Sequence, residues 1–333
     1  MNGRLGGHPQ ISGRRRWPAL PILAAAALPA AIALLASGSC SLAQLYSGLV
    51  DASVDGAGPG GSDGGSGGGD AGTGDAASPC PAEMVGITSS ADSGYCVDKL
   101  EVTNGAYAVF LAQADGGASP DPPGKCDWST SHAPLVTLDG GDLLPVLGVD
   151  WCDAYAYCKW AGKRLCGAVG GGPVSPDRRD TLDGQWFSAC SHKATRSYPY
   201  GADFEITDCA DCNPAAGCDS DASPPTSAPA PVGTRKECAG GYTGLLDMSG
   251  NAAEWEDGCD DGGLRPDAAD DAGKPIADPR YDTCYHRGGS FLLPHGAETG
   301  QACLGCASQF CPVAADLRSH HPRDVGLRCC LDY

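Results

Sequence analysis

Cysteine is the residue type with the most potential for chemistry in this sequence, because it accounts for 19 of the 333 residues. The pairs Cys209-x-x-Cys212 and Cys303-x-x-Cys306 have the spacing of half-sites in a zinc ribbon. In an oxidising compartment, however, the default partner of a cysteine is a second cysteine. With Cys40 set aside, 18 of the 19 cysteines remain, and this even number favours disulfides over metal ligands. The spacing alone does not give their pairing.

Other common catalytic patterns are missing from the sequence. It contains no Gly-x-Ser-x-Gly elbow, no Gly-x4-Gly-Lys phosphate loop and no His-Glu-x-x-His helix. The carboxylate pairs Asp260-Asp261 and Asp270-Asp271 lie in acidic low-complexity loops, where we expect no burial to raise a pKa. A net charge of -19 would repel phosphate, which excludes a nucleic-acid partner.

Residues 1–39 have the order of an export signal. This segment contains four arginines and no acidic residue. An uncharged Ala/Leu-rich run follows the last arginine, and small residues come directly before Cys40. Cys40 resembles the lipid-acceptor cysteine of a bacterial lipoprotein. Cleavage without a lipid, or an uncleaved membrane segment, are the alternatives. We therefore expect an exported protein on the periplasmic side of the envelope, with a lipid anchor or N-terminal segment in the membrane. Ser41 is compatible with outer-membrane sorting.

The chain from 41 to 79 is predicted to be a flexible tether, because most of it is Gly, Asp, Ala and Ser and it has too few apolar residues to bury. The remaining 80–333 is predicted to be one irregular, disulfide-rich α+β domain. Three helices are expected: one after an N-cap at Thr103, one from Asp150 to Gly162, and one over 185–190. Short strands and long Gly/Pro loops make up the rest.

Six segments in this domain carry a resemblance to a known family. They are Glu101-Val102-Thr103-Asn104; Trp151-Cys152-Asp153-Ala154-Tyr155 with Gly162-Lys163-Arg164-Leu165; Tyr198-Pro199-Tyr200-Gly201; Asp247-Met248-Ser249-Gly250-Asn251 with Glu254-Trp255; Arg287-Gly288-Gly289-Ser290-Phe291; and Gly326-Leu327-Arg328-Cys329. In this order they resemble the formylglycine-generating enzyme, or sulfatase-modifying factor, family over residues 80–333.

The resemblance implies a single domain with little regular secondary structure, similar to C-type-lectin-like folds and held together by disulfides and calcium. Well-studied members oxidise a sulfatase cysteine to formylglycine with copper and oxygen, whereas other proteins of the fold only bind ligands. Fold membership therefore does not establish activity.

Calcium is the structural cofactor that the resemblance implies. A hard cation needs six to eight oxygen ligands. Asp247 and Glu254 would offer carboxylates, and Gly250 and Ala252 would offer backbone carbonyls. Asn213 is the counterpart for a second calcium site. The alternative is a turn at Gly250-Asn251 with Trp255 as a core anchor and no ion.

Two disulfides are also implied by the resemblance. One joins Cys158 to Cys329, and the other joins Cys190 to a cysteine of the 303–311 cluster, taken as Cys306. The first would close a long loop and so remove much of the entropy of the unfolded chain.

The copper site is where the sequence departs from active relatives. In these relatives two cysteines follow the Gly-Gly-Ser motif, but the corresponding positions after Ser290 are Leu293 and Glu298, which offer no sulfur. An insertion would instead bring Cys306 and Cys311, which have the same Cys-x4-Cys spacing, into register as copper ligands. The favoured interpretation is that both are structural half-cystines. Were they catalytic, Cys190 would pair with Cys303.

Histidines offer one further metal chemistry. His286, His295 and His320-His321 would be candidates for a three-histidine iron site, as in ergothioneine-type relatives. Those relatives have a separate helical domain with a His-x3-His motif, which this sequence lacks, so we expect surface histidines.

The functional hypothesis is a tethered family member that uses the scaffold for binding, with a protein or peptide ligand, or for an altered activity. One alternative is a formylglycine-generating oxidase with a displaced Cys306/Cys311 copper site. The other is a carbohydrate or peptide receptor.

Overall fold

The computed structural model describes residues 79–90, 93–114, 124–136, 141–204, 209, 228–292, 305–307 and 315–333. The proposed export signal, Cys40 and most of the proposed tether lie outside these residues. Within them no helix is sufficiently long and apolar to cross a bilayer.

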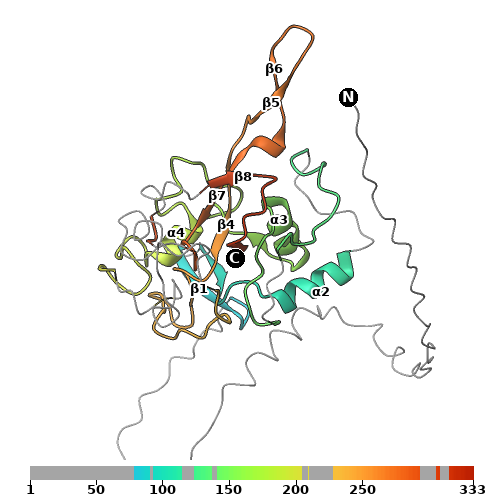
Figure 1. Ribbon diagram of the computed structural model, residues 1–333. Helices are drawn as coiled ribbons and strands as arrows, with labels where there is room; N and C mark the ends of the chain where they lie inside the picture. The colour runs from blue at the N-terminus through green and yellow to red at the C-terminus, as the bar shows by residue number, and fades with distance from the viewer. Residues whose placement is uncertain are drawn as a thin grey trace, which may run out of the picture. The chain divides into compact units, whose positions relative to one another are not determined.

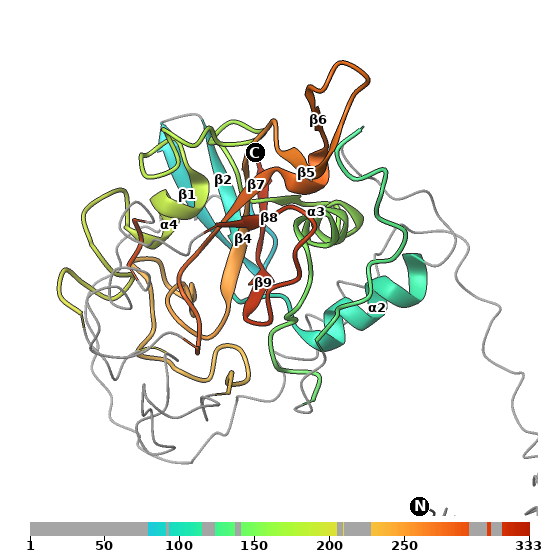
Figure 2. The same ribbon diagram turned by 45° about the horizontal axis from the view of Figure 1, so that its top comes forward.

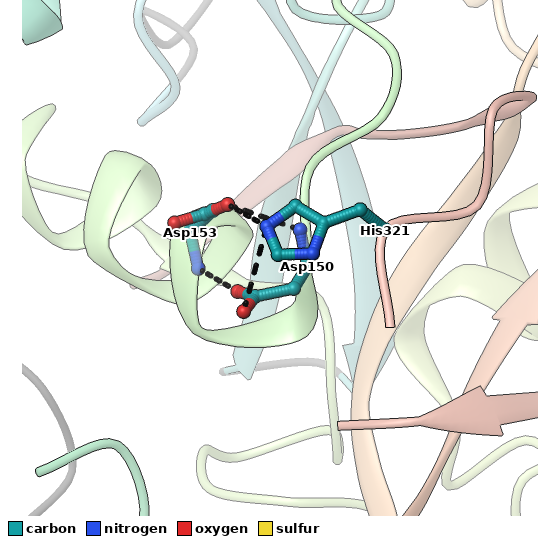
Figure 3. A group of neighbouring side chains, drawn as sticks. All are labelled: Asp150, Asp153 and His321. Carbon is teal, nitrogen blue, oxygen red and sulfur yellow. Dashed lines mark hydrogen bonds and ion pairs between the residues drawn. The ribbon is translucent and has the colours of Figure 1, made fainter. Parts of the chain in front are cut away.

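The three expected helices are confirmed as α2 (Asn104–Ala114), α3 (Trp151–Trp160) and α4 (Gln185–Cys190). The start of α3 is fixed by a capping box, in which the Asp150 carboxylate accepts from the Asp153 amide and the Asp153 carboxylate accepts from the Asp150 amide (Figure 3). These bonds satisfy amides that have no partner within the helix.

The first sheet brings the two ends of the domain together (Figure 1). It contains β1 (Met84–Ser90), β2 (Ser93–Asp98), β10 (Cys329–Asp332) and β3 (Arg164–Leu165), in the order β1-β2-β10-β3, and all pairs are antiparallel. Alternate residues of β1 and β2, such as Ile87 and Val97, are buried in one apolar cluster.

The second sheet is built around β4 (Ala253–Asp260), which lies close to β7 and β9 in Figure 2. Its order is β8-β7-β4-β9, with β7 at Thr283–Arg287, β8 at Ala315–Leu317 and β9 at Val325–Leu327. The β4–β9 pair is parallel and the β4–β7 pair is antiparallel. Trp255 of β4 is fully buried and donates to the Val149 carbonyl, which ties this sheet to the start of α3.

A two-stranded hairpin projects from the second sheet (Figure 1). It consists of β5 (Leu264–Ala269) and β6 (Pro275–Ala277), whose residues are mostly exposed, and a short 3-10 turn at Pro279–Tyr281 leads back to β7. The acidic loop that contains Asp270-Asp271 is therefore on the surface.

Seven disulfides cross-link the described part of the chain. They are Cys80–Cys96, Cys126–Cys152, Cys158–Cys329, Cys166–Cys330, Cys190–Cys306, Cys209–Cys238 and Cys259–Cys284. The domain is therefore the expected irregular, disulfide-rich α+β fold.

Candidate functional site

The Gly-Gly-Ser turn after β7 is held rigidly from two sides. Gly288 and Gly289 both have positive φ, at 84° and 64°, a backbone conformation that disfavours other residues. The buried Ser290 hydroxyl donates to Asp324 at 2.5 Å, and the Phe291 amide donates to the Asn251 carbonyl at 3.0 Å. The turn is thus linked to the loop at Asp324 through Ser290 and to the loop at Asn251 through Phe291.

Arg287 directly precedes this turn, and its buried side chain contacts several neighbouring segments. The guanidinium contacts the Glu256 and Asp180 carboxylates, each at 2.8 Å, and donates to the carbonyls of Arg179 and Cys306. Burial raises the pKa of Glu256, and the Arg287 charge opposes this rise. Arg287 therefore anchors the segment that contains Cys306.

The sulfur of Cys306 is joined to Cys190, and the Cys306 amide donates to the Ser197 carbonyl at 2.8 Å. A half-cystine is not a thiolate, so in this arrangement Cys306 offers no copper ligand. This does not agree with the displaced Cys306/Cys311 copper pair. Cys311, Cys303, Leu293 and Glu298 lie outside the described residues.

The zinc-ribbon interpretation does not agree with the structure either, because Cys209 is bonded to Cys238 and offers no thiolate to a metal. Cys158 is joined to Cys329, across 171 residues, as the resemblance implied. Asn213 and Cys212 lie outside the described residues.

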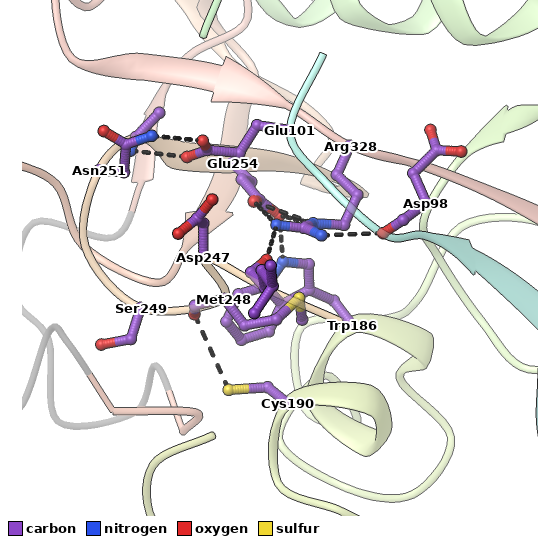
Figure 4. A network of polar contacts seen from close by, with 12 residues as sticks. Asp98, Glu101, Trp186, Cys190, Asp247, Met248, Ser249, Asn251, Glu254 and Arg328 are labelled. Carbon is purple, nitrogen blue, oxygen red and sulfur yellow. Dashed lines mark hydrogen bonds and ion pairs between the residues drawn. The ribbon is translucent and has the colours of Figure 1, made fainter. Parts of the chain in front are cut away.

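Figure 4 shows a buried polar network, which adjoins the Gly-Gly-Ser turn because Gly288 lies against Trp186 and Met248. Glu254 of β4 forms a bidentate ion pair with Arg328, with the closest contact at 2.8 Å, and accepts from the Trp186 indole at 2.7 Å. Arg328 also donates to the carbonyls of Asp98 and Leu246, both at 2.8 Å. Both oxygens of Glu254 are therefore in use.

Two further carboxylates border this network. Glu101 accepts from the Asn251 side chain at 2.6 Å and from the Ala252 amide at 2.8 Å. Asp247 accepts from the Gly233 amide at 2.5 Å. Burial raises the pKa of Glu101 well above its ordinary value, and the neighbouring Asp247 charge adds to the rise. Burial likewise raises the pKa of Asp247.

The residues of the predicted calcium site fit the ion only in part. Asp247 is buried and accepts from the Gly233 amide through Oδ2, which leaves Oδ1 as a candidate ligand. Glu254 does not fit the predicted role, because Arg328 and Trp186 occupy its oxygens.

Three partly buried aromatic rings lie in the chain just after the Ser197 carbonyl that holds Cys306. Tyr198 and Tyr200 stack with 5.5 Å between ring centroids, and Phe204 lies 5.6 Å from Tyr198. Aromatic faces of this kind stack on apolar faces of ligands as well as on one another.

The candidate histidines do not converge on one metal. His286 and His320 share Asp316, at 3.4 Å and 2.5 Å, whereas His321 faces Asp153 at 3.4 Å. His286 is 7% exposed and packs edge-on against Trp255, so the expectation of a surface histidine is wrong there. His295 lies outside the described residues.

Sequence reasoning missed the grouping of His321 with Asp150 and Asp153. The two aspartates were identifiable as residues at a helix start, but nothing in the local sequence connects them to a histidine near the C-terminus.

Residues 68–333 match the family model of the sulfatase-modifying factor enzyme 1-like domain. The solved structure of PvdO from Pseudomonas aeruginosa is similar at 16% sequence identity and a TM-score of 0.41, over 72% of this chain and 81% of that chain. The crystal structure of CarF is similar at 18% identity and a TM-score of 0.39, over 72% of this chain and 87% of CarF. No curated protein matches this chain significantly.

Proposed function

The chain belongs to the sulfatase-modifying factor family, and from this premise we propose that it uses the family scaffold for binding or for an altered activity, not for copper-dependent formation of formylglycine. The observation that carries the proposal is the Cys190–Cys306 disulfide, which removes one sulfur of the Cys-x4-Cys pair. The positions in direct register, Leu293 and Glu298, have no sulfur.

The setting of this function would be outside the cytoplasm. The disulfides suit an oxidising environment. In the proposed arrangement residues 1–39 direct export, Cys40 or the N-terminal segment attaches the chain to the membrane, and 41–79 is the tether. Mass spectrometry of the mature N-terminus tests this arrangement, because lipidation adds a diacylglycerol mass to Cys40.

An assay for aldehyde formation tests the proposal that oxidase activity is absent. The purified full chain is supplied with Cu(I), oxygen and a sulfatase-type Cys-x-Pro-x-Arg peptide, and we expect no aldehyde above the enzyme-free reaction. Cys311→Ser is the matched control. Aldehyde formed by the wild type and lost in this variant would overturn the proposal and establish an oxidase.

A carbohydrate or peptide receptor is the second candidate function. It is favoured by the partly exposed Tyr198, Tyr200 and Phe204 rings, because sugar rings and prolines stack on aromatic faces. Binding to glycan and peptide arrays tests it. We expect Tyr200→Ala to weaken any specific binding without turnover, and equal binding by this variant would count against the aromatic surface as the receptor site.

A further inference from the structure

Side chains from three segments of the chain meet at the start of α3. Asp150 and Asp153 belong to the capping box, His321 comes from the loop before β9, and His132 comes from the loop at 124–136 (Figure 3 shows the first three). We propose that Asp150, Asp153 and His321 bind a divalent transition metal of the zinc class, with His132 orienting Asp153.

The separations of the donor atoms suit a small metal. His321 Nε2 lies 3.4 Å from Asp153 Oδ2 and 3.8 Å from Asp150 Oδ2, and one donor atom of each residue lies within 4.8 Å of the others. Ligands about 2.0–2.2 Å from a tetrahedral zinc ion are roughly 3.3–3.6 Å from one another. Small movements of side chains would therefore complete the site.

The ligands are already fixed in position by other bonds. Asp150 Oδ1 accepts from the Asp153 amide at 2.8 Å, which leaves Oδ2 of Asp150 directed toward His321. Asp153 Oδ1 lies 3.0 Å from His132 Nδ1. The Nε2 atom of His321 faces both carboxylates. A metal bound at this nitrogen would displace the proton that the histidine shares with them.

The charges around the cluster favour a bound cation. Both aspartates are at most 1% exposed, and an oxygen of each carboxylate lies within 4 Å of His321 Nε2. The other groups that face the pair are His132, His321 and the Tyr107 hydroxyl. Two carboxylates also outweigh the partial positive charge of about half a unit at the helix N-terminus.

The ligand types select the metal. Mixed imidazole and carboxylate ligands suit zinc and related transition metals, whereas calcium and magnesium prefer oxygen alone. Three protein ligands leave a fourth position for water or another ligand, and the His321 side chain is 17% exposed, so the cluster is close to solvent.

Zinc titration of the full chain tests the proposal. The protein is stripped of metal with a chelator, calcium is kept present throughout, and zinc binding is measured by calorimetry, with the visible spectrum of bound Co²⁺ as a second readout. We expect His321→Gln and Asp150→Asn each to weaken zinc binding at least about tenfold. Asparagine remains a good N-cap, so Asp150→Asn removes a metal ligand without uncapping α3.

His320→Ala is the matched control, because this adjacent histidine contacts Asp316 instead of the cluster. We expect it to bind zinc like the wild type, and circular dichroism without zinc should show all variants folded. Zinc affinity that is unchanged in both His321→Gln and Asp150→Asn would overturn the proposal. The absence of zinc binding by the wild type would also overturn it, since the cluster would then be a hydrogen-bonded group that holds protons and no metal.

Discussion

Arg328 balances the charge of the buried network beside the Gly-Gly-Ser turn. It is fully buried, as is its partner Glu254, and the carboxylates of Glu101 and Asp247 lie close enough to affect its pKa. The stability of the network depends on this arginine, because removal of one partner leaves an uncompensated buried charge.

We therefore predict that Arg328→Ala lowers the free energy of unfolding by about 3–5 kcal/mol. The comparison is Arg178→Ala, which breaks an exposed ion pair with Asp183 and should cost at most about 1 kcal/mol. Urea denaturation of both variants measures the difference. Equal, small losses would mean that the network does not depend on its cation.

Asp257 in β4 gives the protein a dependence on pH. Burial raises its pKa from 3.8 to about 6, although the Arg164 charge opposes the rise. A carboxyl with a raised pKa in the folded state contributes stability that is complete below about pH 4 and is lost as the pH rises through about 6. Asp257→Asn should remove this part of the pH dependence, about 3 kcal/mol. Thermal unfolding between pH 4 and 8 measures it, and parallel curves for both proteins would contradict the assignment.

Among the elements, the β5–β6 hairpin differs most from the rest of the domain in its exposure. Leu264 and Ile276 are 52% and 37% exposed, and the base of the hairpin is held by the Asp282 carboxylate, which accepts from the amides of Gly262 and Gly263. We therefore expect the free energy of unfolding to depend on these hydrogen bonds at the base of the hairpin and not on the β5 and β6 strands.

Replacement of residues 266–275 by a two-residue Asn-Gly turn is predicted to change the free energy of unfolding by less than about 1 kcal/mol, because these side chains are mostly exposed. By contrast, Gly263→Ala should cost about 2 kcal/mol or more, since a Cβ there would lie 2.0 Å from the Tyr281 backbone. Calorimetric melting of both variants tests the contrast. A large loss in the shortened variant would show that the hairpin packs on the core.

For the whole molecule, two disulfides hold the C-terminal strand to the middle of the chain. Cys158–Cys329 and Cys166–Cys330 close loops of 171 and 164 residues from adjacent positions in β10. Either one alone closes nearly the same long loop. The chain-entropy model therefore gives about 5 kcal/mol for the first bond formed and only about 3 kcal/mol for the second.

Removal of either disulfide by paired Cys→Ala substitutions should thus cost about 3 kcal/mol, and removal of both should exceed the sum of the two losses by about 2 kcal/mol. Denaturant unfolding of the three variants measures this coupling. Strictly additive losses would contradict the shared-loop explanation.

The sequence by itself determined the local features. The N-cap at Asp150 and the apolar spacing after it predicted α3, and six ordered motifs identified the family, because caps, helical faces and turns depend on residues close together in the chain. It also showed that Leu293 and Glu298 carry no sulfur.

Only the tertiary structure decided which distant residues meet. It pairs Cys166 with Cys330, Glu254 with Arg328, and Asp150 and Asp153 with His321. Spacing could not give these pairs, because the paths of the long loops depend on packing and on ion pairs formed across the whole domain. Bringing together residues far apart in the chain costs conformational entropy, and only the packing of the whole domain compensates for it. A short segment of sequence therefore carries no signal for such a contact.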